Sequence, residues 1–322
     1  MRAVVCTEYG PPDVLQLREL EKPIPRDNEV LIRVRAATVL AGDCELRSLD
    51  FPLPFQILMR IGFGFTRPRR KILGQELAGE IESIGNEVKS FKIGDQVYAF
   101  TGFHLGAYAE YDCLPEKGLI ATKPNNMNYE EAAAVPAGGL HSLHLLSKVR
   151  IKDGTNVLIN GAGGSVGTLA IQLAKSFGAE VTGVDSTAKL DVLRSLGADQ
   201  VIDYTKEDFT RSGETYDVIF DVVGRASFTG CLRSLKQNGF FILGNPGVSQ
   251  QIRGLRASRG GGKKVIGGTL AYRSEELLVL KELIEAGKIR SVIDRRYPLE
   301  QVADAHRYVD TGQKTGSVVI TV

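Results

Sequence analysis

The sequence has few cysteines and no arrangement of them that would crosslink a fold. Its four cysteines are scattered, and no C-x-x-C pair is present. Neither a disulfide framework nor a structural zinc site is therefore indicated. We expect reduced, buried thiols, as is usual in the cytoplasm. The four positions are Cys6, Cys44, Cys113 and Cys231.

The chain also lacks long apolar runs and a strong net charge. No stretch of about 18 apolar residues suggests a membrane span, and the apolar run in the opening MRAVVCTEYG is too short for a signal peptide. A formal net charge of +2 gives no electrostatic reason to expect nucleic-acid binding. At 322 residues, we expect two domains with ordinary globular cores and a cytoplasmic location.

The stretch from Asn156 to Asp185 has the pattern of a dinucleotide-binding unit. Val157 to Ile159 reads as a buried parallel strand, a glycine-rich turn follows, and apolar residues then recur at helical spacing. A second strand, Glu180 to Val184, ends in an acid about 20 residues after the turn. The helix N-terminus, with its unpaired N–H groups, favours a pyrophosphate. The alternative is a glycine turn with a structural role only.

The glycine spacing is Gly161-x-x-Gly164-x-x-Gly167 with Gly163 in addition, rather than the usual G-x-G-x-x-G. One glycine permits the tight turn, one lets the backbone approach the pyrophosphate, and one lets helix and strand pack closely. We predict that the cofactor contacts this turn and the ends of two strands. These residues are Gly161, Gly163, Gly164, Ser165, Val166, Gly167, Asp185 and Gly244.

Residues 1 to about 124 are predicted to form a small, barrel-like β domain. Short strands such as Val30–Val34, Leu77–Ile84 and Gln96–Phe100 alternate with glycine-marked turns. The segment from Phe51 to Phe65 is apolar, contains prolines and glycines, and runs into the basic stretch Arg67 to Lys71. We interpret it as a loop over a cleft with solvated basic residues. The alternative is a membrane-surface patch.

The middle of the chain alternates strands and helices, which is typical of a parallel, doubly wound α/β sheet. A helix over Tyr129–Leu146 begins with two acids and is interrupted at Pro136 and at Gly138–Gly139. Lys263–Ile266 is predicted as an edge strand and Ser317–Val322 as the last strand. The other predicted elements are Val157–Ile159, Gly167–Phe177, Glu180–Val184, Leu190–Leu196, Gln200–Ile202, Val218–Val222, Phe228–Leu235, Phe240–Leu243, Glu275–Ala286 and Leu299–Val309.

Nine segments together resemble the medium-chain dehydrogenase/reductase superfamily, in its zinc-independent, quinone oxidoreductase (zeta-crystallin-like) branch. The resemblance covers essentially the whole chain. It implies a GroES-like catalytic domain formed by residues 1–124 and 272–322 around a Rossmann domain of residues 125–271, with the active site in the cleft between them. The segments are GPPDVLQL, GQELAGEIESIG, FKIGDQVYAF, GAYAEY, EAAAVPAGGLHSL, VLINGAGGSVG, LGADQVIDY, FDVVG and VIDRRYPLEQVADAHRYVDTGQKTGSVVI.

The resemblance also allows a prediction about zinc. Zinc-holding relatives carry Cys three residues before an Asp of the first domain, where this chain has Leu40 before Asp43. They carry Gly-His-Glu where this chain has Gly-Gln75-Glu. Leucine cannot ligate zinc and an amide is a poor ligand, so we predict no metal. Without zinc to polarise a carbonyl, the remaining chemistry suits hydride transfer to an enone β-carbon or a quinone ring.

The group that protonates the reduced substrate is less well indicated, because relatives often carry Asn at the position of Leu40. Asp43 and Arg47 match the branch's Asp…Arg pair, which acts in catalysis or as a salt bridge. Tyr98 and His104 fall in the segment implied to line the cleft and could donate to an oxyanion. The predicted catalytic residues are Asp43, Tyr98 and His104, each with a structural role as the alternative. His141, His144 and His306 are interpreted as ordinary helix residues.

The cofactor preference rests on conflicting residues. The carboxylate of Asp185 favours NADH, because it can accept the ribose hydroxyls and repels a 2′-phosphate. Ser186, Lys189 and Tyr204 match the groups that hold the 2′-phosphate in NADPH-dependent relatives of the alkenal reductase type. Lys189 could instead pair with Asp185. We predict NADPH, with NADH as the alternative.

The sequence thus predicts an NAD(P)H-dependent oxidoreductase that reduces a quinone or an α,β-unsaturated carbonyl (an enone or alkenal) without zinc. The alternative is a nucleotide-binding structural or redox-sensing protein with little catalysis. The expected partners are a small-molecule substrate and a second copy of the chain, with no nucleic acid and no membrane. A homodimer is expected because an unpaired edge strand tends to be covered.

Overall fold

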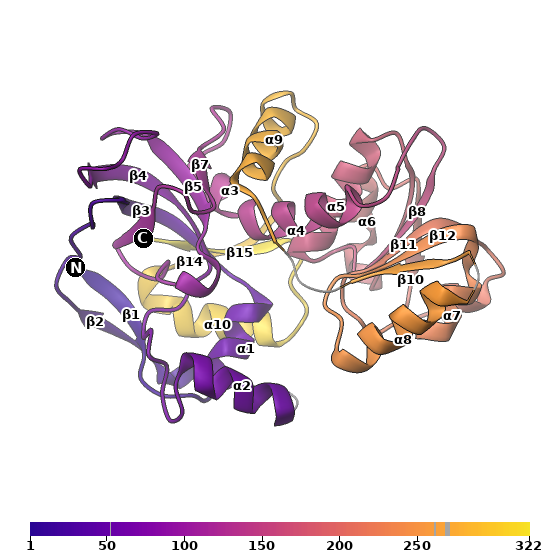
Figure 1. The fold of residues 1–322 in the computed structure, drawn as a ribbon, viewed down its shortest axis with the longest axis horizontal. Coiled ribbons are helices and arrows are strands. Elements are labelled where there is room, and N and C mark those ends of the chain that lie inside the picture. The colour runs from indigo at the N-terminus through magenta and orange to yellow at the C-terminus, as the bar shows by residue number, and fades with distance from the viewer. Residues whose placement is uncertain (52, 261, 268–270) are drawn as a thin grey trace. The chain divides into compact units, whose positions relative to one another are not determined.

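The computed structural model describes residues 1–51, 53–260, 262–267 and 271–322, and it separates into two compact units (Figure 1). Unit 1 comprises Met1–Ala137, Arg273–Glu285 and Ser291–Val322. Unit 2 comprises Gly138–Tyr272 and Ala286–Arg290. Because both ends of the chain belong to unit 1, the chain enters and leaves the fold through the same unit.

Unit 2 is built on a six-stranded parallel sheet in the order β10-β9-β8-β11-β12-β13. Numbered along the chain, this is the order 3-2-1-4-5-6 of a doubly wound dinucleotide-binding sheet. The order in which the chain adds strands reverses between β8 and β11, although all strands stay parallel. The predicted edge strand, β13, does lie at an edge. The strands are β8 (Asn156–Asn160), β9 (Glu180–Asp185), β10 (Gln200–Asp203), β11 (Tyr216–Asp221), β12 (Leu235–Leu243) and β13 (Lys264–Ile266).

Helices of unit 2 connect these strands. Their apolar residues pack on the sheet, as in α5, where Leu169, Ile171 and Leu173 are fully buried. The helix over 248–259 was not predicted, because its sequence is largely polar and basic. The helices are α4 (Pro136–Leu146, whose first two residues belong to unit 1), α5 (Ser165–Ser176), α6 (Leu190–Ser195), α7 (Phe228–Arg233) and α8 (Val248–Arg259).

Unit 1 is built on a seven-stranded sheet in the order β14-β15-β3-β4-β5-β7, with β6 also paired to β3. The last strand, β15, pairs with β3 and β14, so the C-terminal segment joins the sheet formed by the N-terminal residues. A separate hairpin pairs β1 with β2. The strands are β1 (Arg2–Cys6), β2 (Leu15–Glu19), β3 (Glu29–Val39), β4 (Glu76–Ile84), β5 (Gln96–Phe100), β6 (Tyr111–Pro115), β7 (Ile120–Thr122), β14 (Ile293–Pro298) and β15 (Ser317–Thr321).

The helices of unit 1 include one correction to the sequence prediction. Residues 51–65 are not a loop, because α2 spans Leu53–Phe63. Pro54 occupies the first turn, where a missing N–H costs nothing, and Gly64 follows the last residue with a φ of 122°. Similarly, Pro136 separates two helices as predicted, but Gly138–Gly139 continues inside α4. The helices of unit 1 are α1 (Ala41–Ser48), α2, α3 (Tyr129–Ala133), α9 (Ser274–Glu285) and α10 (Val302–Asp310).

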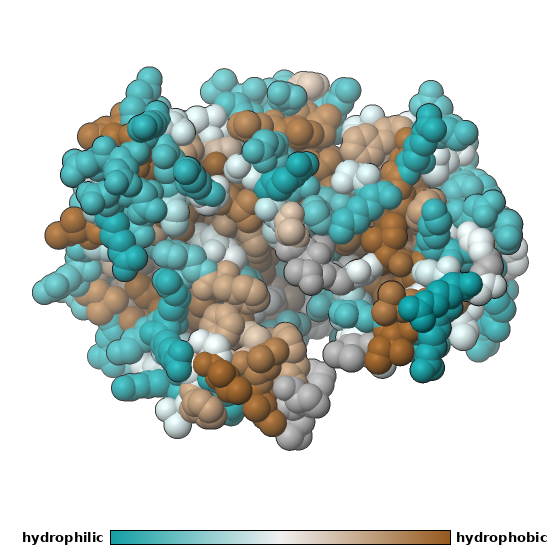
Figure 2. All heavy atoms as spheres, in the orientation of Figure 1, coloured by the Kyte–Doolittle hydropathy of each residue, from teal (hydrophilic) through white to brown (hydrophobic). Residues whose placement is uncertain are grey.

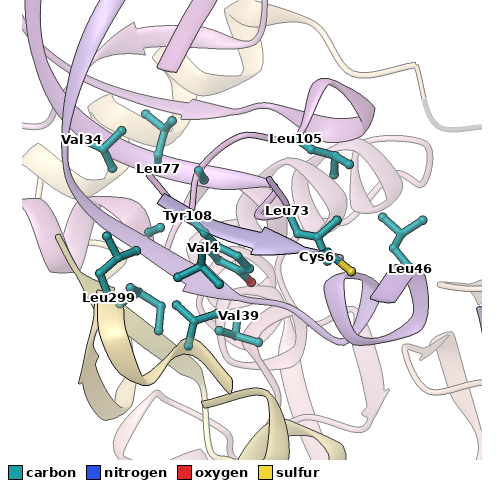
Figure 3. Packing of buried hydrophobic residues seen from close by; sticks show 14 of the residues in the cluster. Val4, Cys6, Val34, Val39, Leu46, Leu73, Leu77, Leu105, Tyr108 and Leu299 are labelled. Carbon is teal, nitrogen blue, oxygen red and sulfur yellow. The ribbon is translucent and has the colours of Figure 1, made fainter. Parts of the chain in front are cut away.

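A hydrophobic core fills unit 1 between its strands and α10 (Figure 3). Val4, Val39 and Leu77 from the strands belong to the same buried cluster as Leu299, which lies just before α10. Each is below a tenth exposed, and burying one such side chain contributes about 2 kcal/mol. All four cysteines, each among the described residues, are buried and free of disulfides, as predicted. Among the described residues, no helix is long and apolar enough to cross a membrane.

Candidate active site

The glycine turn of unit 2 joins β8 to α5 and leaves a helix N-terminus open. Gly161 adopts a φ of 81°, a left-handed conformation suited to glycine. A Cβ on Gly167 would lie 2.3 Å from the Gly161 carbonyl oxygen, so only a glycine lets α5 pack this closely on the turn. At Gly164 the nearest atom to a Cβ would be 3.8 Å away. There is therefore space next to Gly164, at the N-terminus of α5, and no side chain caps the N–H groups of its first turn. Such a helix N-terminus is suited to bind a pyrophosphate.

Asp185, at the end of β9, is turned toward this glycine turn. Its Oδ2 accepts the Gly163 N–H at 2.7 Å, and its Oδ1 accepts the Ser186 N–H at 2.8 Å. Lys189 lies over the pair, with its Nζ 3.4 Å from Asp185 Oδ1. A Cβ on Gly163 would lie 2.5 Å from Lys189 Cδ, so Gly163 makes room for the lysine. The carboxylate is therefore neutralised by a nearby cation and held by two N–H donors.

The other predicted phosphate-site residues surround this pair. The Tyr204 N–H donates to the Asp185 carbonyl at 3.2 Å, while the Tyr204 side chain is 60% exposed. Thr187 points elsewhere, because its hydroxyl donates to Asp203. Hydrogen bonds from Thr187 and Thr205 hold the pKa of Asp203 well below its usual range. The structure thus brings the three predicted residues, Ser186, Lys189 and Tyr204, together around Asp185.

Gly244 follows β12 at the carboxyl edge of the sheet, and its N–H donates to the Asp221 carbonyl at 2.9 Å. Asp221 ends β11 and is fully buried, with one oxygen bonded to the Asn160 amide at 2.9 Å. Its other oxygen, Oδ2, is buried without a partner. Burial raises the pKa of Asp221. Because β8 and β11 flank the reversal of strand order, this edge is where a doubly wound sheet binds ligands.

A polar pair that sequence reasoning missed lies over the same edge. His141 of α4 has its Nδ1 2.9 Å from the Tyr272 hydroxyl and its ring stacked on Phe220 of β11. Burial and the neighbouring His144 lower the pKa of His141 to about 4, so the imidazole is neutral at pH 7. The two residues are 131 positions apart. No sequence pattern links them, and interpreting His141 as an ordinary helix residue overlooked this bond.

In unit 1, Asp43 belongs to a buried polar chain. Its Oδ2 accepts the Leu40 N–H at 2.9 Å and the Tyr108 hydroxyl at 3.1 Å. The Tyr108 oxygen lies 3.2 Å from His306 Nε2, and Cys44 Sγ lies 3.3 Å from His306 Nδ1. Burial raises the pKa of Asp43 to about 7 and lowers that of His306 to about 3. The imidazole of His306 is therefore neutral near pH 7, whereas the Asp43 carboxyl is about half protonated there.

Arg47 does not form the salt bridge with Asp43 that the family resemblance left open; it pairs with Asp310. Its Nη2 donates to Asp310 at 2.9 Å, and its Nε donates to the Gly10 carbonyl at 3.0 Å. The guanidinium also lies 3.3 Å from His306 Nδ1. Arg47 is only 4% exposed, so it ties α1 to α10 as a buried cation. Asp43 and Arg47 are therefore not paired with each other. Arg47 contacts His306 directly, and Asp43 is linked to His306 through Tyr108.

Tyr98 and His104 each have partners of their own. The buried Tyr98 hydroxyl donates to the Leu277 carbonyl of α9 at 2.6 Å. His104 is partly exposed, with its Nε2 3.7 Å from Asp112 Oδ1. The other Asp112 oxygen is buried without a partner. In this geometry the Tyr98 hydroxyl proton is already bonded to a backbone carbonyl and is not free for a substrate. The His104 imidazole, in contrast, is partly exposed to solvent.

Comparison with known proteins identifies the family. Residues 26–125 match the alcohol dehydrogenase GroES-like domain, and residues 196–320 match a family described as zinc-binding dehydrogenase. The chain is 35% identical to 2-methylene-furan-3-one reductase of Solanum lycopersicum, across 99% of this chain and 79% of the relative. The chain belongs to the medium-chain dehydrogenase/reductase superfamily.

Two further superfamily members are informative. The chain is 34% identical to the chloroplastic NADPH-dependent alkenal/one oxidoreductase of Arabidopsis thaliana, across 99% of this chain and 79% of the relative. It superimposes on the quinone oxidoreductase of Escherichia coli complexed with NADPH with a TM-score of 0.84, at 28% identity and full coverage of both chains. The predicted fold class, a Rossmann sheet with a GroES-like barrel domain, is confirmed.

The name of one matched superfamily domain includes zinc, and the residues of this chain do not fit that metal. Leu40 offers only its backbone, and Gln75 offers an amide. The adjacent Glu76 is engaged by the Thr38 hydroxyl and by the Ala137 N–H at 2.7 Å. Among the described residues, no three His, Cys, Asp or Glu side chains are grouped to hold a metal ion. Cys44 and His306 do meet, but the Arg47 guanidinium beside them would repel a cation.

We therefore expect the purified protein to contain no stoichiometric zinc and to keep its full turnover in a chelator. The physical reason is the donor set around Leu40 and Gln75. Elemental analysis of metal per chain, with activity measured before and after chelation, tests this. About one zinc per chain, with turnover lost on chelation, would show that ligands outside this pair hold the metal.

Asp43 predicts a pH dependence of stability. Its pKa rises from 3.8 in the unfolded chain to about 7 in the folded one, so between these values the folded state keeps a proton that the unfolded state releases. The protonated carboxyl therefore contributes fully to the free energy of unfolding below pH 3.8. This contribution is lost as the pH rises from 3.8 through about 7. The loss amounts to roughly 4 kcal/mol at about 1.4 kcal/mol per pK unit. In Asp43→Asn this contribution disappears.

Denaturant unfolding of wild type and Asp43→Asn at pH 5 and pH 8 measures the effect. The free energy of unfolding of the variant, relative to wild type, should rise with pH. If the two proteins change in parallel between pH 5 and pH 8, then Asp43 titrates normally and its burial does not matter.

Proposed function

We propose that this protein is an NADPH-dependent reductase of quinones or of enones and alkenals, and that it works without zinc. The observation that carries the proposal is the glycine turn with the open N-terminus of α5, completed by Lys189 and Ser186 around Asp185. Two relatives of this chain are named for NADPH, alkenals and quinones.

When bound, NADPH supplies the hydride for conjugate reduction. The chain's own residues bind and orient the two substrates. The N-terminus of α5 would hold the pyrophosphate. The side chains of Ser186, Lys189 and Tyr204 would hold the 2′-phosphate. The oxyanion left on the reduced substrate needs a hydrogen-bond donor and then a proton. For this role we propose His104, because its imidazole is partly exposed and its Nε2 lies 3.7 Å from Asp112 Oδ1, which can orient the ring.

The other predicted catalytic residues keep narrower roles in this proposal. Asp43 accepts the Leu40 N–H and the Tyr108 hydroxyl, which gives it a positioning role at the start of α1. Tyr98 can act only if its hydroxyl leaves the Leu277 carbonyl. A His104→Gln variant separates these assignments: it should lower kcat several-fold without changing the KM for NADPH. An unchanged kcat would reject His104 as the donor.

The test of the function is NADPH oxidation with 9,10-phenanthrenequinone and with an alkenal as acceptors. Turnover with either acceptor supports the reductase. Tight NADPH binding without turnover on a panel of quinones, alkenals and cyclic enones would instead favour a nucleotide-binding protein with little catalysis. Binding is followed separately by nucleotide fluorescence, so a failed acceptor screen is not confused with a failed cofactor site.

We also propose domain limits at residues 1–124 and 272–322 for the catalytic domain and 125–271 for the nucleotide-binding domain. Support comes from β15, which pairs with β3, and from the separate six-stranded sheet. Expression of residues 125–271 alone, with NADPH binding as the readout, tests these domain limits.

A cytoplasmic location is proposed because the four thiols are buried and form no disulfide. Fractionation of source cells tests this location.

A homodimer is expected to form through β13. This strand lies at the edge of the parallel sheet, and an exposed edge offers unpaired N–H and C=O groups that a second copy can satisfy. Light scattering at micromolar concentration should give twice the chain mass of 35.0 kDa. A monomer mass under these conditions would contradict the assignment of β13 as an interface.

A further inference from the structure

Helix α2 exposes an apolar face that unit 1 does not cover. Phe55 is 46% exposed, Ile57 52%, Leu58 60% and Ile61 53%. Phe55, Leu58 and Ile61 are spaced three residues apart, and Ile57 lies four residues before Ile61, so the four side chains share one broad side of the helix. Figure 2 shows the apolar atoms gathered over α2 at the lower edge of the view. Scattered apolar residues are ordinary on a surface, but a contiguous face of this size marks an interaction site.

The opposite side of α2 is anchored to unit 1. The Gln56 amide donates to the Leu49 carbonyl at 2.9 Å, and Met59 is buried in the core. Phe63 packs edge-on against Phe103 with ring centroids 5.3 Å apart. The helix is therefore fixed by one side while it presents the other. A helix that is apolar all round is normally covered on both sides.

The charge of the segment is as one-sided as its hydrophobicity. Residues 51–75 contain no Asp or Glu, while a basic stretch follows the helix directly. All four of its basic side chains are exposed, and two of them also act on neighbouring groups: Arg70 on Asp112 and Arg69 on Tyr9. The basic residues of the segment are Arg60, Arg67, Arg69, Arg70 and Lys71, of which the last four are exposed.

We propose that α2 and the basic stretch Arg67–Lys71 form a surface that docks on an anionic lipid bilayer. An apolar helix face inserts at the boundary between headgroups and acyl chains, and neighbouring lysine and arginine side chains bind anionic headgroups. Both properties occur within one continuous segment of this chain. The sequence left a membrane-surface patch open as the alternative to a loop with solvated basic residues, and the helix over Leu53–Phe63 now favours that alternative.

A second copy of the chain fits this surface less well. A two-fold interface places the same patch on both partners, so two basic stretches would face each other without an acid between them. A rival docking surface exists on α8, where Ile252 and Leu255 are exposed beside three arginines. It presents two large apolar side chains where α2 presents four, so α2 is the better match for a bilayer.

The docking does not depend on the proposed reaction. Its benefit does rest on the proposed function, because long-tailed quinones and lipid-derived alkenals partition into the same bilayers. An enzyme held at the membrane surface would meet such acceptors where they are concentrated. Turnover with a soluble acceptor tests the reaction, and vesicle binding tests the docking, so the two can fail separately.

The experiment is co-sedimentation of the full chain with vesicles of phosphatidylcholine, with or without phosphatidylglycerol. Wild type should bind the anionic vesicles, and added salt should weaken the binding. Arg67→Gln/Arg69→Gln/Lys71→Gln should weaken it about 100-fold, at about five-fold per cation. Leu58→Gln/Ile61→Gln should weaken it by at least as much. Circular dichroism and thermal unfolding confirm that each variant is folded.

The matched control is Leu278→Gln/Val279→Gln on α9, which removes two similarly exposed apolar side chains beside acidic residues. It should leave vesicle binding unchanged, as should Leu255→Gln on α8. Equal binding to neutral and anionic vesicles would overturn the proposal, as would a loss confined to the α8 variant. So would a wild type that ignores vesicles but dimerises through α2, with the dimer lost in Leu58→Gln/Ile61→Gln.

Discussion

Replacing Gly167 by alanine is expected to cost about 3 kcal/mol of unfolding free energy and to raise the KM for NADPH strongly. The added Cβ would lie 2.3 Å from the Gly161 carbonyl oxygen and 2.5 Å from the Ala162 Cα. Both obstacles are backbone atoms, which cannot rotate away as a side chain can. Overpacking of this kind typically costs 1–3 kcal/mol, and a rigid obstacle places it at the upper end. Once α5 is pushed from the turn, its N–H groups no longer point at the pyrophosphate.

Gly164→Ala is the matched control, because it adds the same methyl group three residues earlier. There the nearest atom would be 3.8 Å away and the φ is −82°, which alanine accepts. Stability should change by less than about 1 kcal/mol, because the entropic gain of replacing glycine is offset by the loss of a favourable N-cap residue. The KM for NADPH should still rise, because the methyl stands where the phosphate approaches. Denaturant midpoints and KM values for both variants test this, and a Gly167→Ala protein as stable as wild type would refute the packing argument.

The contrast between these glycines shows how far sequence reasoning could go. The β8–α5–β9 unit was predictable because a strand pattern, a glycine turn and a helical pattern follow each other without a gap. The role of each glycine was not, since it depends on atoms that only the folded chain brings near. Gly163, the extra glycine of the motif, makes room for Lys189, a side chain from beyond the next strand.

The polar networks were harder to foresee, because their members come from distant parts of the chain. Asp43, Tyr108 and His306 form one chain of contacts, yet 198 positions separate the last two. The match between Asp43 and Arg47 was visible, but the true partner of Arg47, Asp310, was not. Helix α2 was missed for a local reason: two prolines suggested a loop, although one of them lies in the first turn, where a helix tolerates it.

Replacing Lys189 by alanine is expected to reverse the cofactor preference. Two effects act in the same direction. The variant loses a charge-assisted contact to the 2′-phosphate, worth about 1.5–3 kcal/mol, or roughly 10- to 100-fold in kcat/KM. It also frees Asp185, which Lys189 holds at 3.4 Å in the structure. The uncompensated carboxylate then repels the 2′-phosphate and can accept ribose hydroxyls, so kcat/KM for NADH should change little or rise.

Asp185→Asn separates the two effects. In the wild type the Gly163 nitrogen lies 2.7 Å from Asp185 Oδ2. The amide oxygen of the variant can still accept this N–H, but it carries no charge to repel the phosphate. In the Lys189→Ala background it should restore part of the NADPH activity, because only the lost contact remains. The measurement is kcat/KM for both cofactors across wild type, the two single variants and the double variant. If wild type prefers NADH and Lys189→Ala leaves the NADPH value unchanged, no phosphate site exists at Lys189. Asp185 then sets the preference alone, and its turn toward the glycine loop is a packing contact that the ribose displaces.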